Sequence, residues 1–224
     1  AKGVAKKCAF HISDEPAPDH YAQFKEAFDF IRPLIKDYKV MDATSEAGRD
    51  LLDIPVMDLA HVPDKLNGNE WVYYCCSAYL NHVPNRFINM PSVRNRVLGD
   101  MLYLSGVKGF LQWGFNFYNA CLSYFPINPF ISTDANGLFP AGDSFVVYPG
   151  TDCEPWDSLR LEVFFDAIQD RSALKLLESL TSRENVENLV RGEGVELWFT
   201  YPTDGRSIKN LREKVNAAIK AATK

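Results

Sequence analysis

The sequence predicts an α/β fold with parallel strands, because short apolar runs alternate with segments whose apolar residues recur at helical spacing. Parallel strands need crossover connections of about a dozen residues or more, and the segments 14–37 and 80–107 are long enough to form such connections. The connections that follow the strands are often long and carry the less usual residues. The expected strands are 7–13, 38–44, 54–62, 70–79 and 108–117.

The first two strands flank the clearest helical pattern. Residues 7–13 (KCAFHIS) form an apolar run that stops before two prolines. A helix is expected over 19–37, where Asp19 suits the first turn and Pro33 should kink the last one. The second strand is YKVMDAT at 38–44. The apolar face of the helix consists of Tyr21, Phe24, Phe28, Ile31 and Ile35.

The middle of the chain repeats this alternation. A short helix near 46–53 precedes the strand IPVMDLAHV at 54–62. The aromatic run EWVYYCCSAY at 70–79 forms the next strand. Ser92 is expected to cap a helix that runs to about residue 105.

The C-terminal half begins with the fifth strand, KGFLQWGFNF at 108–117. Residues 118–143 form a long loop rich in Pro, Asn, Asp and Gly, and such loops are usually functional or disordered. SFVVYPG at 144–150 predicts an extra strand or a hairpin, and 157–181 predicts a long helix. The tail adds an expected strand, GVELWFTYP, and a last helix, RSIKNLREKVNAAIKAA.

The composition argues against some classes of protein. The chain has 224 residues and a net charge of -5, which disfavours nucleic-acid and anionic-membrane partners. No apolar stretch is long enough to cross a bilayer. The five cysteines lack metal-site spacing and suggest reduced thiols in a cytoplasmic protein, although secretion stays open. The four histidines do not cluster at metal-ligand spacing, so we expect no metal and no cofactor.

Two adjacent acids, Asp14 and Glu15, stand where the first apolar run stops. In a parallel α/β barrel, catalytic groups lie at the carboxyl ends of the strands and in the loops that follow them. Two carboxylates beside a sugar are the minimum for cleaving a glycosidic bond, one as the proton donor and one to support positive charge. The alternative is a pair of solvated turn residues that favour the start of the next helix.

Aromatic and amide side chains gather near the other predicted strand ends. Sugar rings have apolar faces that stack on aromatic rings, so together these residues predict a polar pocket with aromatic walls. Each residue alone has a structural alternative, such as Trp113 in a barrel core or Arg86 in a surface ion pair. The predicted substrate-binding residues are Tyr74, Asn85, Arg86, Trp113, Asn116 and Tyr118.

Three segments carry a resemblance to a known family. They are HISDEP, the stretch from EWVYYCC through NRFIN to GFLQWGFNFYNA, and GDSFVVYPG followed by SLRLE. At these mutual spacings, and over nearly its whole length, the chain resembles bacterial proteins related to glycoside hydrolase family 123, including the domain of unknown function 4091. The resemblance implies a glycosidase of carbohydrate metabolism that acts on β-linked N-acetylgalactosamine with retention, on a (β/α)8 TIM barrel.

In that family an adjacent Asp-Glu pair follows the fourth barrel strand. Carried over to this chain, the resemblance implies that Glu15 acts as the general acid and later as the base. It also implies that Asp14 orients the 2-acetamido group of the substrate, whose oxygen attacks the anomeric carbon. This substrate-assisted scheme is a known exception to the two-carboxylate retaining mechanism.

The same resemblance assigns the five expected strands to barrel strands four to eight. Residues 1–181 would then be the C-terminal portion of the barrel, and 182–224 a small strand-helix extension packed on it. We expect strands one to three to come from an N-terminal part of the protein or from a second copy of the chain. The implied partners are therefore a carbohydrate substrate and either that N-terminal part or a homo-oligomer.

Two other functions stay open. An incomplete barrel could bind carbohydrate without turnover, and the acid pair could serve as a conventional acid and nucleophile on another sugar. Arg160 and Glu162 in SLRLE are interpreted as an ion pair that ties the last barrel helix to the barrel, and His11 as a core histidine.

Overall fold

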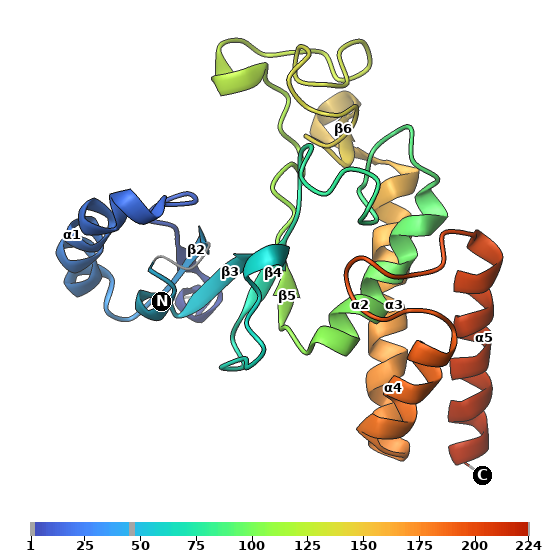
Figure 1. The fold of residues 1–224 in the computed structure, drawn as a ribbon. Helices are drawn as coiled ribbons and strands as arrows, with labels where there is room; N and C mark the ends of the chain where they lie inside the picture. Colours follow the sequence, from blue (N-terminus) through green and yellow to red (C-terminus); the bar gives the residue numbers. More distant parts are fainter. Residues whose placement is uncertain (1–2, 45–47, 224) are drawn as a thin grey trace. The chain divides into compact units, whose positions relative to one another are not determined.

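The computed structural model describes residues 3–44 and 48–223, and Figure 1 shows their fold. The chain forms two compact units, and each is described by itself. Unit 1 consists of Ala1–Tyr74 and Gly106–Leu111, and unit 2 consists of Cys75–Ser105 and Gln112–Lys224. The boundary predicted at residue 181, between the barrel portion and its extension, is a different division from these two units and stays a prediction.

Unit 1 is built on one sheet of five parallel strands (Figure 1). The strands lie side by side in chain order, and each pairs in parallel with the next. This arrangement confirms the predicted α/β fold with parallel strands. The strands are β1 (Ala9–Phe10), β2 (Lys39–Thr44), β3 (Ile54–Asp58), β4 (Trp71–Tyr73) and β5 (Gly109–Phe110).

One helix and two 3-10 turns form the connection between β1 and β2. Phe24 and Phe28 of the helix are buried with Ile35 and Val40, and these four side chains form a core. Pro33 lies in the 3-10 turn that directly follows the helix, so the expected kink is a change to 3-10 geometry. The elements are η2 (Pro18–His20), α1 (Tyr21–Ile31) and η3 (Arg32–Ile35).

The strand predicted at 54–62 is shorter than its apolar run. The carboxylate of Asp58 accepts a hydrogen bond from the backbone N–H of Ala60 at 2.9 Å. Asp58 therefore caps a 3-10 turn, η5 (Leu59–His61), and the strand ends at the capping residue.

Two further expectations are corrected by 3-10 turns in unit 1. The helix expected near 46–53 is only η4 (Arg49–Leu51), and residues 45–47 lie outside the described ranges. The strand expected from residue 7 begins later, because η1 (Val4–Lys7) precedes it.

Glu70 fixes the loop that leads into β4. Its buried carboxylate accepts hydrogen bonds from the backbone N–H groups of Asn67 at 2.6 Å, Gly68 at 2.9 Å and Asn69 at 3.1 Å. Arg49 donates to the same carboxylate at 3.1 Å. Burial acts to raise the pKa of Glu70, but these bonds outweigh it, and the pKa is lowered. The carboxylate is therefore ionised where it holds the loop.

Unit 2 is mainly helical, and its longest helix, α3, packs against α2, α4 and α5 (Figure 1). Gly99 allows α2 to approach α3 closely, since a Cβ atom at this position would lie 1.9 Å from the carbonyl oxygen of Ala167. Every helix among the described residues is too short or too polar to cross a membrane. The elements are η6 (Ser92–Val97), α2 (Leu98–Ser105), α3 (Leu159–Leu180), α4 (Arg183–Gly192) and α5 (Gly205–Ala222).

The segment between α2 and α3 contains the expected long loop and a hairpin. Residues 118–143 form the loop, which includes η7 (Cys121–Ser123). β6 (Val147–Pro149) and β7 (Pro155–Asp157) then pair in antiparallel fashion around η8 (Thr151–Cys153). The hairpin confirms one of the two structures expected from SFVVYPG.

Two predicted boundaries in the middle of the chain are wrong. Pro91, not Ser92, occupies the N-cap position of η6, and no side chain caps this turn. The strand expected at 108–117 ends at Phe110. Its pairing with β4 closes where the N–H of Leu111 donates to the carbonyl oxygen of Val72 at 2.9 Å.

The tail also differs from the prediction. Residues 194–202 form no strand. Val195 and Trp198 are buried three residues apart, which is not the alternation of a half-buried strand. Helix α4 was not predicted, because only Val186 and Val190 in its sequence are buried apolar residues.

A charged cluster lies between the helices of unit 2. Asp170 on α3 is buried, accepts a hydrogen bond from Nε of Arg96 at 2.5 Å and also binds Arg212 of α5. Asp100 on α2 is buried as well. Burial raises the pKa of Asp100 well above its ordinary value, the charge of Asp170 raises it further, and the two arginines oppose this rise.

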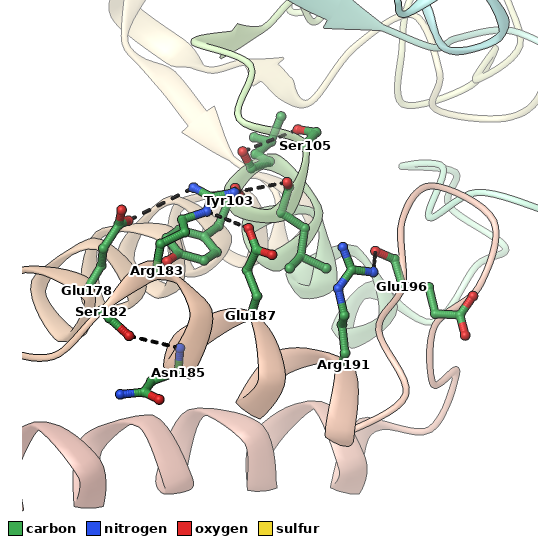
Figure 2. A network of polar contacts seen from close by, with 11 residues as sticks. Tyr103, Ser105, Glu178, Ser182, Arg183, Asn185, Glu187, Arg191 and Glu196 are labelled. Atoms are coloured by element: carbon green, nitrogen blue, oxygen red, sulfur yellow. Dashed lines mark hydrogen bonds and ion pairs between the residues drawn. The ribbon is translucent and has the colours of Figure 1, made fainter. Parts of the chain in front are cut away.

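Arg183 joins the start of α4 to the end of α2, as Figure 2 shows. Its guanidinium donates to the carbonyl oxygens of Tyr103 at 2.9 Å and Leu104 at 3.0 Å. It also pairs with Glu187 at 2.5 Å and Glu178 at 4.0 Å, and lies 4.5 Å from the centre of the Tyr103 ring. The last carbonyls of a helix have no partner within it, so Arg183 satisfies two of them.

Candidate active site

The acid pair lies in the segment that leaves the carboxyl end of β1. The N–H of Glu15 donates to the carbonyl oxygen of Ala43 on β2 at 3.0 Å, which ties the segment to the sheet. The side chains of Asp14 and Glu15 are both exposed. The structure therefore fixes the backbone here and leaves both carboxylates accessible.

Glu15 has an unusual backbone conformation. Its φ of 47° lies in the left-handed region, which costs a residue with a Cβ atom about 1–2 kcal/mol. The hydroxyl of Tyr73, at the end of β4, donates to Oε1 of Glu15. Strained residues that persist in a fold concentrate at functional sites, and here the strained residue is one of the predicted acids.

An open pocket of about 300 Å³ lies beside the pair within unit 1. One wall is the acid-pair segment and the other is the start of α1. The pair can offer this pocket a proton donor or acceptor and a fixed negative charge, which are the groups that glycoside cleavage requires. The lining residues are Ile12, Ser13, Asp14, Glu15, Pro16, His20, Gln23, Phe24 and Ala27.

A third acid, Asp42 on β2, binds the segment that precedes the pair. It is 0% exposed, and its Oδ1 accepts hydrogen bonds from the N–H groups of Ile12 at 2.8 Å and Ser13 at 3.1 Å. Its Oδ2 has no hydrogen-bond partner among the described residues. Burial raises the pKa of Asp42, the bonds from Ile12 and Ser13 and the electrostatic effect of His11 oppose the rise, and the charge of Asp14 adds to it.

His11 is not a core residue, contrary to the sequence-based interpretation. Its side chain is 57% exposed, and its Nδ1 lies 2.6 Å from Oδ1 of Asp42 and 3.0 Å from the carbonyl oxygen of Met41. The apolar run around His11 suggested burial on both faces. However, β1 is an edge strand with exposed residues, so one face of the histidine remains open.

The predicted substrate-binding residues fall in both units. Tyr74 belongs to unit 1, is fully buried and packs edge-on against Phe110 at 5.1 Å between ring centres. The other five residues belong to unit 2. Because Tyr74 is fully buried, its ring offers no surface for contact with a ligand.

Two of the unit 2 residues, Asn85 and Arg86, are buried. Arg86 donates through Nε to the side-chain oxygen of Gln112, and its burial, at 2% exposure, rules out the surface ion pair considered above. Neither polar atom of the Asn85 amide has a hydrogen-bond partner among the described residues. A buried amide of this kind is costly unless a ligand or a water molecule completes its bonds.

The remaining three predicted residues are accessible in unit 2. Nε1 of Trp113 donates to Oδ2 of Asp143 at 2.8 Å, while the Trp113 ring is only partly buried. Asn116 is exposed and forms an isolated bridge with Phe145. The hydroxyl of Tyr118 donates to the carbonyl oxygen of Val147 at 2.9 Å. These residues thus combine ring faces and amides that a sugar could reach.

Three residues were not identified from the sequence although they bind the predicted site residues or the segments that carry them, namely Asp42, Tyr73 and Asp143. Asp42 could have been suspected as a lone acid inside the apolar run VMDAT, and Tyr73 as one of two tyrosines at the end of an apolar run. Asp143 is buried and accepts from both Trp113 and the N–H of Cys76, at 2.8 and 2.7 Å. Nothing in the sequence around Asp143 indicates this role.

Arg160 is structural, but not through an ion pair with Glu162. It is buried at the start of α3, and its Nη1 donates to the carbonyl oxygens of Arg86 at 3.0 Å and Phe145 at 2.7 Å. Residues two apart on a helix point away from each other, which explains why Glu162 is not its partner. In the described part of the chain, no three His, Cys, Asp or Glu residues lie close enough to hold a metal ion.

Comparisons with known proteins bear on the family and the fold of the chain. Residues 1–177 match the model of a family described as "Glycoside hydrolase 123, catalytic domain". A solved family 123 glycoside hydrolase from Clostridium perfringens, studied for glycolipid glycan hydrolysis, is 16% identical with a TM-score of 0.63. The match covers 96% of this chain but only 41% of that protein. No curated protein matches the sequence. Because the family model covers most of its length, this chain belongs to the glycoside hydrolase 123 catalytic-domain family.

Proposed function

We propose that the protein is a glycoside hydrolase that cleaves terminal β-linked N-acetylhexosamine, with N-acetylgalactosamine as the favoured sugar. The observation that carries the proposal is the exposed pair Asp14 and Glu15 beside an open pocket, in a chain of the glycoside hydrolase 123 family. The solved relative, studied for glycolipid glycan hydrolysis, supports a sugar at the end of a larger glycan.

In the proposed mechanism, Glu15 protonates the leaving oxygen and later removes a proton from the attacking water. The nucleophile is the acetamido oxygen of the substrate, which has a high effective concentration when it is held against the anomeric carbon. Asp14 orients the acetamido N–H and supports the positive charge that develops on this group. The hydrogen bond from Tyr73 to Glu15 supports a fixed orientation of the acid.

The strands of unit 1 are proposed to be strands four to eight of a (β/α)8 barrel. Their parallel pairing in strict chain order supports this proposal, since a barrel orders its strands in the same way. Residues 1–181 would supply the barrel portion and 182–224 an extension packed on it. Strands one to three would come from the rest of the protein or from a second copy.

The proposed sugar-binding residues are Trp113, Asn116 and Tyr118, together with the buried Asn85 and Arg86. The free amide of Asn85 supports the proposal, because a bound sugar hydroxyl would satisfy it. Trp113 is held in one orientation by Asp143 and is suited to stack on a sugar face.

The test is hydrolysis of 4-nitrophenyl β-N-acetylgalactosaminide by the full-length natural protein. Glu15→Gln should lower kcat on the order of 10²–10⁴-fold. In kcat/KM, which reports the release of the leaving group, the loss should be much smaller on β-N-acetylgalactosaminyl fluoride, since fluoride leaves without a proton. The loss of the base in the second step should still lower kcat on this substrate. Asp14→Asn should lower kcat about 10²-fold on both substrates. Glu26→Gln, an exposed carboxylate of α1 that does not line the pocket, is the matched control and should retain full activity.

Three other outcomes would contradict parts of this proposal. Equal turnover by Glu15→Gln and the natural protein would overturn the acid-base assignment. Hydrolysis of sugars without an acetamido group would indicate a conventional acid and nucleophile. Calorimetric binding of N-acetylgalactosamine without hydrolysis would indicate a carbohydrate-binding protein.

A further inference from the structure

We propose that Asp42 is a positioning residue, which sets the backbone in front of Asp14 and Glu15 and thereby orients both acids. This inference rests on the proposed function, because it assigns a support to the same site. Neither the comparisons nor the sequence pattern gives Asp42 a role. Its assignment comes from the contacts of its carboxylate.

The geometry of the carboxylate replaces part of the strand ladder. β1 pairs with β2 through the partners Ala9 with Lys39 and Phe10 with Val40, and then stops. The next backbone donors toward β2, at Ile12 and Ser13, both bind Oδ1 of Asp42. One side-chain oxygen thus takes over two backbone donors at the point where the chain turns toward the acids.

The burial of Asp42 makes this support stiff. The side chain is fully buried in β2, and Ala43 and Thr44, which follow it, are also buried. An ionised or strongly polarised acceptor forms stronger bonds to N–H groups than a neutral one. Two residues after Ser13, Glu15 is also bound, through its N–H to the carbonyl oxygen of Ala43 and through its carboxylate to the hydroxyl of Tyr73. Asp14 is therefore held between two fixed points.

Glu70 provides a matched comparison within the same unit. Like Asp42 it is almost fully buried, at 1% exposure, and its carboxylate accepts several consecutive backbone N–H groups. It differs in its place, since it precedes β4, at the opposite end of the strands from the acid pair. The two carboxylates therefore share a local structure but only Asp42 adjoins the candidate site.

The experiment compares Asp42→Ala, Asp42→Asn and Glu70→Ala in the full-length natural protein. Amide hydrogen exchange at Ile12 and Ser13 reports the support directly, and kcat and KM for 4-nitrophenyl β-N-acetylgalactosaminide report its effect on the site. Asp42→Ala should accelerate exchange at these two amides on the order of 10-fold or more. It should lower kcat about 100-fold, the loss that a displacement of about 1 Å can cause, with a much smaller change in KM.

The conservative and control variants separate positioning from general damage. Asp42→Asn keeps a carbonyl oxygen for the two N–H groups and places its NH2 where Oδ2 has no partner, so it should restore slow exchange and most of kcat. Glu70→Ala should accelerate exchange at Asn67–Asn69 and leave kcat within about 3-fold. If Asp42→Ala does not fold, Asp42→Asn provides the test. Slow exchange at Ile12 and Ser13 together with most of kcat supports the inference, and fast exchange with full kcat overturns it.

The inference is overturned if Asp42→Ala exchanges Ile12 and Ser13 as slowly as the natural protein, or if Glu70→Ala lowers kcat equally. A wild-type protein without turnover would overturn the proposed function alone. In that case the exchange rates would still decide whether Asp42 holds the segment.

Discussion

At the scale of single residues, Glu15 has a property that the sequence did not reveal. Its backbone is left-handed, whereas Asp14 beside it does not have a positive φ. The adjacent position in the sequence predicted that both acids could serve one site, and their exposure is compatible with this. The left-handed conformation and the bond from Tyr73 depend on strands that are distant in sequence, so they could not be predicted from HISDEP alone.

The strain at Glu15 leads to a prediction about stability. Glu15→Gly should be about 0.5–1 kcal/mol more stable than Glu15→Ala, because glycine avoids the cost of a left-handed Cβ, partly offset by its greater unfolded-state entropy. At Asp14 the order should reverse, with Asp14→Gly about 0.5–1 kcal/mol less stable than Asp14→Ala. Urea unfolding of the four variants measures both differences. If the alanine variant is the more stable one at both positions, Glu15 is unstrained.

At the scale of elements, the strands and the long helices were predicted because their apolar periodicity is strong. The exact strand ends were not, since side chains such as Asp58 close them early. Helix α4 was missed because it is held largely by polar contacts. Its Ser182 accepts a bond from the N–H of Asn185 at 3.2 Å, a capping signal that the sequence does contain (Figure 2).

The polar contacts of α4 can be tested at Arg183. Arg183→Ala should lower the free energy of unfolding by about 1–3 kcal/mol, since it leaves the carbonyl oxygens of Tyr103 and Leu104 without their donor. Arg183→Lys should recover less than half of this loss, because Nη2 of Arg183 binds both oxygens while Nε and Nη1 pair with Glu187 and Glu178, and a single ammonium cannot do all three. Thermal and urea unfolding provide the measurement.

Arg191 is the control for this substitution on the same helix. It is exposed, and among the described residues its side chain donates only to the carbonyl oxygen of Glu196, at 3.3 Å (Figure 2). Arg191→Ala should change stability by no more than about 0.5 kcal/mol. Equal losses at Arg183 and Arg191 would contradict the assigned role of the Arg183 guanidinium.

At the scale of the whole molecule, the stability should depend on the protonation of Asp100. Its folded pKa is raised by burial, so the folded state binds a proton that the unfolded state releases. This contribution favours folding at low pH and is lost as the pH rises from the unfolded pKa through the folded one. Asp100→Asn removes the charge, so its stability relative to the natural protein should increase over that window, by about 1–3 kcal/mol at neutral pH.

Urea unfolding at several pH values from acid to neutral tests this expectation. Asp166→Asn is the control, because Asp166 is half-exposed and lies 3.5 Å from the same Arg96. It should lower stability by no more than about 1 kcal/mol at neutral pH, without the gain expected for Asp100→Asn. A constant difference between Asp100→Asn and the natural protein at every pH would rule out the titration of Asp100.

The interleaving of the two units has a consequence for synthesis. Unit 1 takes β5 from Gly106–Leu111, but the chain first passes through Cys75–Ser105 of unit 2. During synthesis on the ribosome, the edge of β4 that pairs with β5 therefore stays unpaired until all of that intervening segment has emerged. Unpaired edges invite association with other chains, so nascent protein should be most vulnerable to aggregation in this interval. For the same reason, no single cut in the gene separates the two units.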